Sequence, residues 1–212
     1  MEEYRTDEER AEALKEWWSE NGTSVVGGII IGLAAVFGWR GWQDYQITQA
    51  EAASDLYQKI VVDIRNEKDD EAKTLALQLI DEYPSTTYAV FAHLIMAKLF
   101  VEKNDYSAAT EHLQWVIDNA SENEFQLLAR LRLARILLAE DKPEQSIELL
   151  NAVDPGEFLA SYEELKGDSY IKQGKTEDAR NAYNNALSNQ KISGRDNSIL
   201  EMKLGNLGQL NQ

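Results

Sequence analysis

The sequence contains no cysteine, and only three prolines and twelve glycines among its 212 residues. The absence of cysteine excludes disulfides, thiolate zinc sites and cysteine nucleophiles. The few prolines and glycines leave few points at which a helix would be broken. Since 43% of the residues are hydrophobic, a packed core can form. This composition predicts an all-α protein.

Positive charge is also scarce. The formal net charge is −16, and residues 1–20 hold eight acidic side chains against three basic ones. An acidic chain repels phosphates, which argues against nucleic acid or anionic lipid headgroups as a main ligand.

Groups that carry chemistry are few. The sequence has two histidines, His93 and His112, nineteen residues apart, and no glycine-rich phosphate loop. A lone histidine in a helix is usually a packing or surface residue, and carboxylate runs at helix ends are mostly solvated. We expect no catalytic constellation, no metal and no cofactor, and therefore a protein that is not an enzyme.

The longest uncharged run, residues 21–39, reads NGTSVVGGIIIGLAAVFGW. As a helix it covers roughly 28 Å, close to the ~30 Å hydrocarbon core of a bilayer. Four of the five tryptophans flank it, where indole rings would lie in the headgroup layers. A buried helix of a soluble domain would not explain aromatic residues at both ends. We predict a transmembrane helix over 21–42, anchored by Trp17, Trp18, Trp39 and Trp42.

Lysine and arginine counts set the expected orientation. Three basic residues precede the span, whereas Arg40 is the only one shortly after it. This predicts a cytoplasmic amphipathic helix over 1–20 and a C-terminal part across the membrane. The bulky exit Phe37-Gly38-Trp39-Arg40 is untypical of a cleaved signal, so we expect a retained anchor.

Small residues form a stripe inside the span. Gly28 and Gly32 make a GxxxG pair, and Ala35 continues the same face. Because small residues allow another helix to approach closely in lipid, this face is a candidate interface for a partner or a second copy. Such stripes also occur by chance.

A helical stripe follows the span. Between Gly41 and Pro84 there is neither proline nor glycine, and apolar residues recur at three- and four-residue steps to Ile64. We predict a juxtamembrane helical strut over 43–66 that merges into the next domain.

The rest of the chain repeats itself. Gly167, Tyr170, Gly174, Ala179 and Tyr183 follow the tetratricopeptide pattern of two packed helices. Similar small residues recur upstream at steps of 33 and 37. We predict a solenoid over 50–190 with four units, at 50–86, 87–122, 123–157 and 158–190. Residues 191–212 would form a capping helix, at about 197–207, and a tail.

The first helices of such units line a concave groove. The register places two apolar sets and one acidic set on it, and an exposed apolar groove normally binds a protein partner. Burial against the strut or the tail is the alternative. The candidate binding residues are Phe91, Leu94, Val101, Leu128, Leu131, Arg135 and Leu138, with Lys98 beside them; the acidic set is Ser161, Glu164, Asp168 and Ile171.

Several segments resemble one known family. Glu16-Trp17-Trp18, Glu20-Asn21-Gly22 and Gly38-Trp39-Arg40, followed by degenerate repeats, are similar to the YfgM-like family of ancillary SecYEG translocon subunits. The resemblance implies a single-pass protein of the bacterial inner membrane, with its N-terminus in the cytoplasm and its repeats in the periplasm. It also implies partnership with the SecYEG translocon and a PpiD-like membrane-anchored chaperone, so that unfolded secretory clients meet a chaperone as they emerge. No catalytic residues carry over.

The sequence also allows a second function. The same architecture suits an assembly scaffold for another envelope machine, such as a cell-division or signalling complex.

Proteolysis of spheroplasts tests the orientation. If residues 40–212 lie outside the cytoplasm, added protease should degrade the repeats and leave a membrane-protected fragment of roughly residues 1–45. Immunoblotting of an N-terminal tag measures that fragment. Full protection of the C-terminal part in sealed spheroplasts would contradict the predicted orientation.

Overall fold

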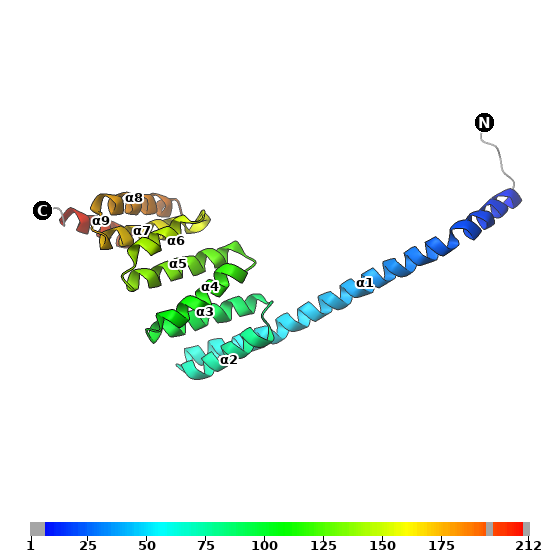
Figure 1. Cartoon of the computed structure of the whole chain (residues 1–212), viewed down its shortest axis with the longest axis horizontal. Helices are drawn as coiled ribbons and strands as arrows, with labels where there is room; N and C mark the ends of the chain where they lie inside the picture. The colour runs from blue at the N-terminus through cyan, green and yellow to red at the C-terminus, as the bar shows by residue number, and fades with distance from the viewer. Residues whose placement is uncertain (1–6, 194–196, 210–212) are drawn as a thin grey trace, which may run out of the picture. The chain divides into compact units, whose positions relative to one another are not determined.

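The computed structural model describes residues 7–193 and 197–209, and all its elements are helical (Figure 1). An all-α repeat protein is therefore confirmed. The helices are α1 (Asp7–Arg65), α2 (Asp69–Glu82), α3 (Thr87–Glu102), α4 (Tyr106–Asn119), α5 (Asn123–Ala139), α6 (Pro143–Asn151), the short 3-10 helix η1 (Gly156–Phe158), α7 (Leu159–Lys172), α8 (Thr176–Ser193) and α9 (Ser198–Gln209).

The chain divides into two compact units, one up to Glu51 and one from Ala52 onward. The first unit consists of most of α1, and residues 1–6 of the predicted 1–20 helix lie outside the described residues. Helix α1 has the length and composition to cross a membrane. Its apolar side chains, such as Ile30, Ile31 and Phe37, are exposed. A bilayer would cover this apolar surface.

The second unit is a stack of helix pairs in chain order (Figure 1). The end of α1 shares a hydrophobic cluster with α2, in which Ile60 lies with Ala72 and Leu79. The helices α3–α4, α5–α6 and α7–α8 follow as further pairs. Ala53 and Ile60 of α1 are fully buried, so the first pair takes its first helix from the helix that carries the span. Among the described residues, hydrophobic clusters run through the pairs and their neighbours.

Small residues lie where the two helices of each pair meet. The residues that the sequence spacing singles out on the second helices are all completely buried: Ala72, Ala109, Ser146 and Ala179. Ser146 is the polar one, and its hydroxyl donates to the carbonyl of Ala134 over 3.0 Å. Because that bond satisfies the hydroxyl, serine is tolerated where the other pairs have alanine.

The turn inside each pair has one conformation. Its left-handed residue is Glu67, Asn104, Asp141 or Gly174, with φ of 59°, 58°, 61° and 73°. The next amide donates to the carbonyl five residues back over 2.8–2.9 Å, which closes the first helix as a Schellman motif. The sequence predicts this turn at Gly174; at the other three positions a residue with a Cβ adopts it.

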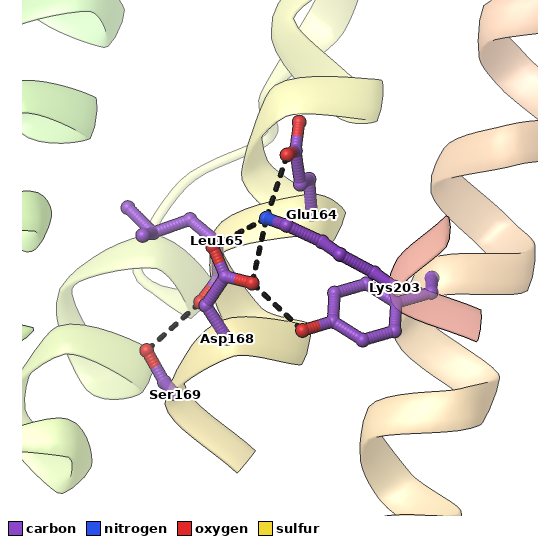
Figure 2. Close-up of polar contacts among 6 residues, drawn as sticks. Glu164, Leu165, Asp168, Ser169 and Lys203 are labelled. Carbon is purple, nitrogen blue, oxygen red and sulfur yellow. Dashed lines mark hydrogen bonds and ion pairs between the residues drawn. The ribbon is translucent and has the colours of Figure 1, made fainter. Parts of the chain in front are cut away.

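Helix α9 closes the C-terminal end of the stack. Leu200 and Leu207 are buried against the last pair. Figure 2 shows Lys203 reaching from α9 to Glu164 and Asp168 on α7, at Nζ–oxygen distances of 2.7–2.8 Å. Burial opposes the charge of Lys203, but hydrogen bonds to Asp168 and Glu164 hold its pKa above the ordinary value. The terminal helix therefore covers apolar surface and supplies a cation that pairs with two carboxylates.

Substitution of Gly167 tests the helix crossing. A Cβ at Gly167 would overlap the ring of Tyr183, whose hydroxyl donates to Asp168 over 2.7 Å and fixes the ring. We expect Gly167→Ala to lower the free energy of unfolding by about 1–3 kcal/mol through overpacking. Thermal or urea unfolding of the full chain in detergent micelles measures it.

Gly205→Ala is the matched control, because a Cβ at Gly205 on α9 meets nothing within 4 Å. That change should leave the repeat domain unchanged or stabilise it by about 0.4–1 kcal/mol. Equal effects of the two substitutions would contradict the role given to Gly167.

A candidate partner-binding groove

A cavity of about 370 Å³ lies between α3, α4 and α5. Its volume falls in the range typical of ligand pockets. Apolar side chains form most of its lining, and charged side chains from two neighbouring first helices join them. The lining residues are Ala97, Lys98, Val101 and Glu102 of α3, Tyr106 and Leu113 of α4, and Arg132, Arg135, Ile136 and Ala139 of α5.

The charged side chains of this groove are mostly cationic. Lys98 pairs with Glu102 at 3.5 Å, and both side chains are half-exposed. In the part of the chain that the structure describes, no carboxylate lies within ion-pair distance of Arg132 or Arg135. Burial and the neighbouring charge of Arg135 lower the pKa of the Arg132 guanidinium. An anion in the groove would relieve this repulsion.

The groove contains some of the residues that the sequence register predicts for it. Val101 and Arg135 line the cavity together with Lys98. Leu94 and Leu131, in contrast, are 7% and 3% exposed and belong to the hydrophobic core. The expectation that these two leucines lie in an open groove is therefore wrong.

Neighbouring first helices account for that difference, because they pack side by side. The Arg132 side chain of α5 approaches the backbone of α3 at Leu94, with Nη1 3.5 Å from the carbonyl oxygen. Leu131 lies in a cluster with Leu127, Tyr162 and Leu165. Replacing either leucine by serine would therefore destabilise the core, so such a variant could not be used to test binding in the groove.

The remaining predicted residues are half-buried. Leu128 and Leu138 pack against the core clusters. Phe91 belongs to an aromatic group, with ring centroids 5.4 Å from Tyr57, 6.0 Å from Tyr88 and 5.3 Å from Phe125. The two predicted apolar sets thus do not form one open surface, and the open part of the groove is the cavity beside Val101 and Arg135. Binding by any of these seven residues stays a prediction.

Arg132 is the functional candidate that the sequence reasoning missed. It lies three residues before Arg135, on the side of α5 that turns toward α3. The run Leu131-Arg132-Leu133-Ala134-Arg135 carried the signal, since a helix places residues three apart on one side.

A second candidate surface lies on the span. A Cβ at Gly28 or Gly32 would meet nothing within 4 Å, and Ala35 is exposed on the same face. Trp17, Trp18, Trp39 and Trp42 are also exposed, and the rings of the last two lie 5.3 Å apart. The face is open to another helix, and its use as an interface stays a prediction.

The two histidines meet at the interface of α3 and α4. Nδ1 of His93 lies 2.9 Å from Nδ1 of His112, so one neutral ring donates to the other. His93 also stacks on Trp115, with ring centroids 3.9 Å apart. Burial, and next the charge of His112, lower the pKa of His93 to about 4. This geometry is that of a neutral packing pair.

Comparison with known proteins identifies the same repeat domain in this sequence. The chain matches the family described as tetratricopeptide repeat-like domain over residues 15–209. It is 31% identical over 202 residues to the ancillary SecYEG translocon subunit of Haemophilus influenzae, covering 95% of this chain and 97% of the relative. The subunit of the same name from Escherichia coli is 28% identical over 207 residues, covering 98% and 99%.

Solved structures support the repeat architecture alone. Two chains of MamA resemble the repeats, the RS-1 ArsTM double mutant and residues 41 to the end of the protein from Desulfovibrio magneticus RS-1. Their TM-scores are 0.55 and 0.54 at 15% identity, and each match covers 77% of this chain. The matches cover 97% and 95% of the MamA chains.

The histidine pair makes stability depend on pH. His93 has a pKa of about 4 in the folded chain against 6.5 when unperturbed, so the unfolded chain binds more protons between these values. Stability is therefore complete above pH 6.5 and falls as the pH drops toward 4, by on the order of 2–3 kcal/mol. Urea unfolding at several pH values measures this slope.

Carboxylates also titrate in that range, so a His93→Phe variant provides the comparison. Phenylalanine keeps the stacking on Trp115 but cannot take up a proton. The variant should lose part of the decline between pH 6.5 and 4. Identical slopes for the two proteins would show that the pair does not govern the pH dependence.

Proposed function

Because this chain belongs to the family of ancillary SecYEG translocon subunits, we propose that it is a non-enzymatic accessory protein of the Sec translocon. It is anchored in the bacterial inner membrane by the span of α1, with its N-terminus in the cytoplasm and its repeats in the periplasm. There it connects the channel to a PpiD-like membrane-anchored chaperone and so assists the biogenesis of secreted and membrane proteins.

One observation carries the proposal. The similarity to the named subunits extends over nearly the whole length of this chain and of each relative, so it includes the span and the repeats together. A repeat domain alone would support only a general scaffold. The joint match favours the translocon over another envelope machine.

Two surfaces supply the contacts in this proposal. The face of Gly28, Gly32 and Ala35 lies within the lipid, where close helix packing replaces the hydrophobic effect as the driving force. The groove beside Val101 and Arg135 lies outside the membrane, where the chaperone and emerging clients would meet it. The span thus contacts the channel, and the groove binds partners in the periplasm.

A binding role accounts for the side chains better than a catalytic one. The titratable groups that the fold brings together pair with one another: His93 with His112, and Lys203 with Glu164 and Asp168. A catalytic acid or base needs access to substrate.

Bulky substitutions in the span test the proposal. Gly28→Leu combined with Gly32→Leu raises hydrophobicity, so insertion should persist. The variant should nevertheless lose helix packing worth about 1–2 kcal/mol and recover several-fold less SecYEG on co-purification in mild detergent. Immunoblotting of SecY against the recovered bait measures the loss.

The matched control is Gly27→Leu combined with Ala34→Leu. It adds similar bulk on a different face of the same helix, where a Cβ at Gly27 also meets nothing. The control should recover SecYEG as the unsubstituted chain does. Unchanged recovery by the Gly28/Gly32 variant would remove that face from the proposal, and no recovery by the unsubstituted chain would overturn the translocon role.

A further inference from the structure

The groove between α3 and α5 differs in electrostatics from the end of the stack. At the C-terminal end, the cation Lys203 of α9 faces the acids Glu164 and Asp168 of α7 (Figure 2). The register aligns Asp168 with Lys98 of α3 and Arg135 of α5. The fourth pair thus carries an acid where the second and third pairs carry cations.

This difference gathers positive charge in the middle of the stack. Lys98 of α3 lines the same cavity as Arg132 and Arg135 of α5. Glu102 compensates Lys98 at 3.5 Å, but the two arginines have no carboxylate partner in the described chain. In a protein of net charge −16, this pair forms a local cationic site that a negatively charged group would complement.

The cavity also has an apolar part. Val101 and the aromatic ring of Tyr106, both half-buried, form its apolar walls, and the core residues Leu113 and Ile136 lie beneath them. A free inorganic anion would leave this surface uncovered. An apolar side chain would fill it, while a neighbouring carboxylate reached the guanidinium groups with charge-assisted hydrogen bonds.

We propose that this groove binds a protein partner through a peptide segment that carries an aspartate or glutamate side chain beside an apolar side chain. The carboxylate pairs with Arg135 and Arg132, and the apolar side chain enters the cavity beside Val101 and Ile136. The carboxylate of the bound segment thereby balances the positive charge of the two arginines, as Asp168 balances that of Lys203 at the end of the stack. The inference rests on the proposed use of the groove as a partner surface.

Fluorescence anisotropy of the full chain in detergent micelles tests this selectivity. The probe is a short fluorescein-labelled, C-terminally amidated peptide of alanine and serine, with leucines flanking a single glutamate. Two further probes carry glutamine or lysine in place of that glutamate. The unsubstituted chain should bind the glutamate probe about tenfold or more tightly than the glutamine probe, and the lysine probe least.

Arg135→Glu reverses the charge at the proposed contact. This variant should lose affinity for the glutamate probe by about tenfold or more and should prefer the lysine probe. Lys103→Glu is the matched control, because Lys103 directly follows α3 and pairs with the exposed Asp70 without lining the cavity. It should bind all three probes as the unsubstituted chain does.

Each alternative outcome is informative. Equal binding of the glutamate and glutamine probes, or equal losses in the Arg135→Glu and Lys103→Glu variants, would overturn the inference, as would failure of the glutamate probe to bind. Co-purification of SecYEG with the unsubstituted chain tests the translocon role separately from the ligand of the groove. If the channel is recovered but the probe does not bind, the inference fails alone; if the probe binds but the channel is not recovered, the translocon role fails.

Discussion

The two helices of a repeat can approach closely only where a very small side chain lies between them. Ala72, Ala109, Ser146 and Ala179 satisfy this condition, and each is completely buried. In the last pair the helices approach so closely at Gly167 that the Tyr183 ring occupies the space that a Cβ would need. The hydrophobic clusters, the positions of the first helices and the groove between α3 and α5 all depend on these contacts.

The repeat fold could be predicted because this steric limit appears in the sequence as small residues at steps of 33 and 37. The turns were harder to predict, since Glu67, Asn104 and Asp141 adopt a left-handed conformation at which glycine is the usual signal. Their Schellman hydrogen bonds compensate a conformational cost of about 1–2 kcal/mol. Asn and Asp adopt this conformation more readily than other residues with a Cβ, so residue type is a weak signal at Asn104 and Asp141 and none at Glu67.

The candidate groove was only partly predictable. The helical register places Val101 and Arg135 on the groove side of their helices, and both line the cavity in the structure. The same register cannot say how closely neighbouring first helices pack, and that packing buries Leu94 and Leu131. The approach of Arg132 to the backbone at Leu94 and the meeting of His93 with His112 have the same origin, because they depend on contacts between helices.

Helix α1 has one consequence for the order of assembly. Ala53 and Ile60 are core residues of the first pair, although they belong to the helix that carries the span. A stack of repeats can in general begin to fold at any of its units. Here the first helix of the first pair is part of the helix that inserts into the membrane. It is therefore already formed when α2 and α3 pack against it. Folding that starts at the membrane and proceeds toward α9 follows the order in which the chain is synthesised, and Lys203 is the last cation to find its partners.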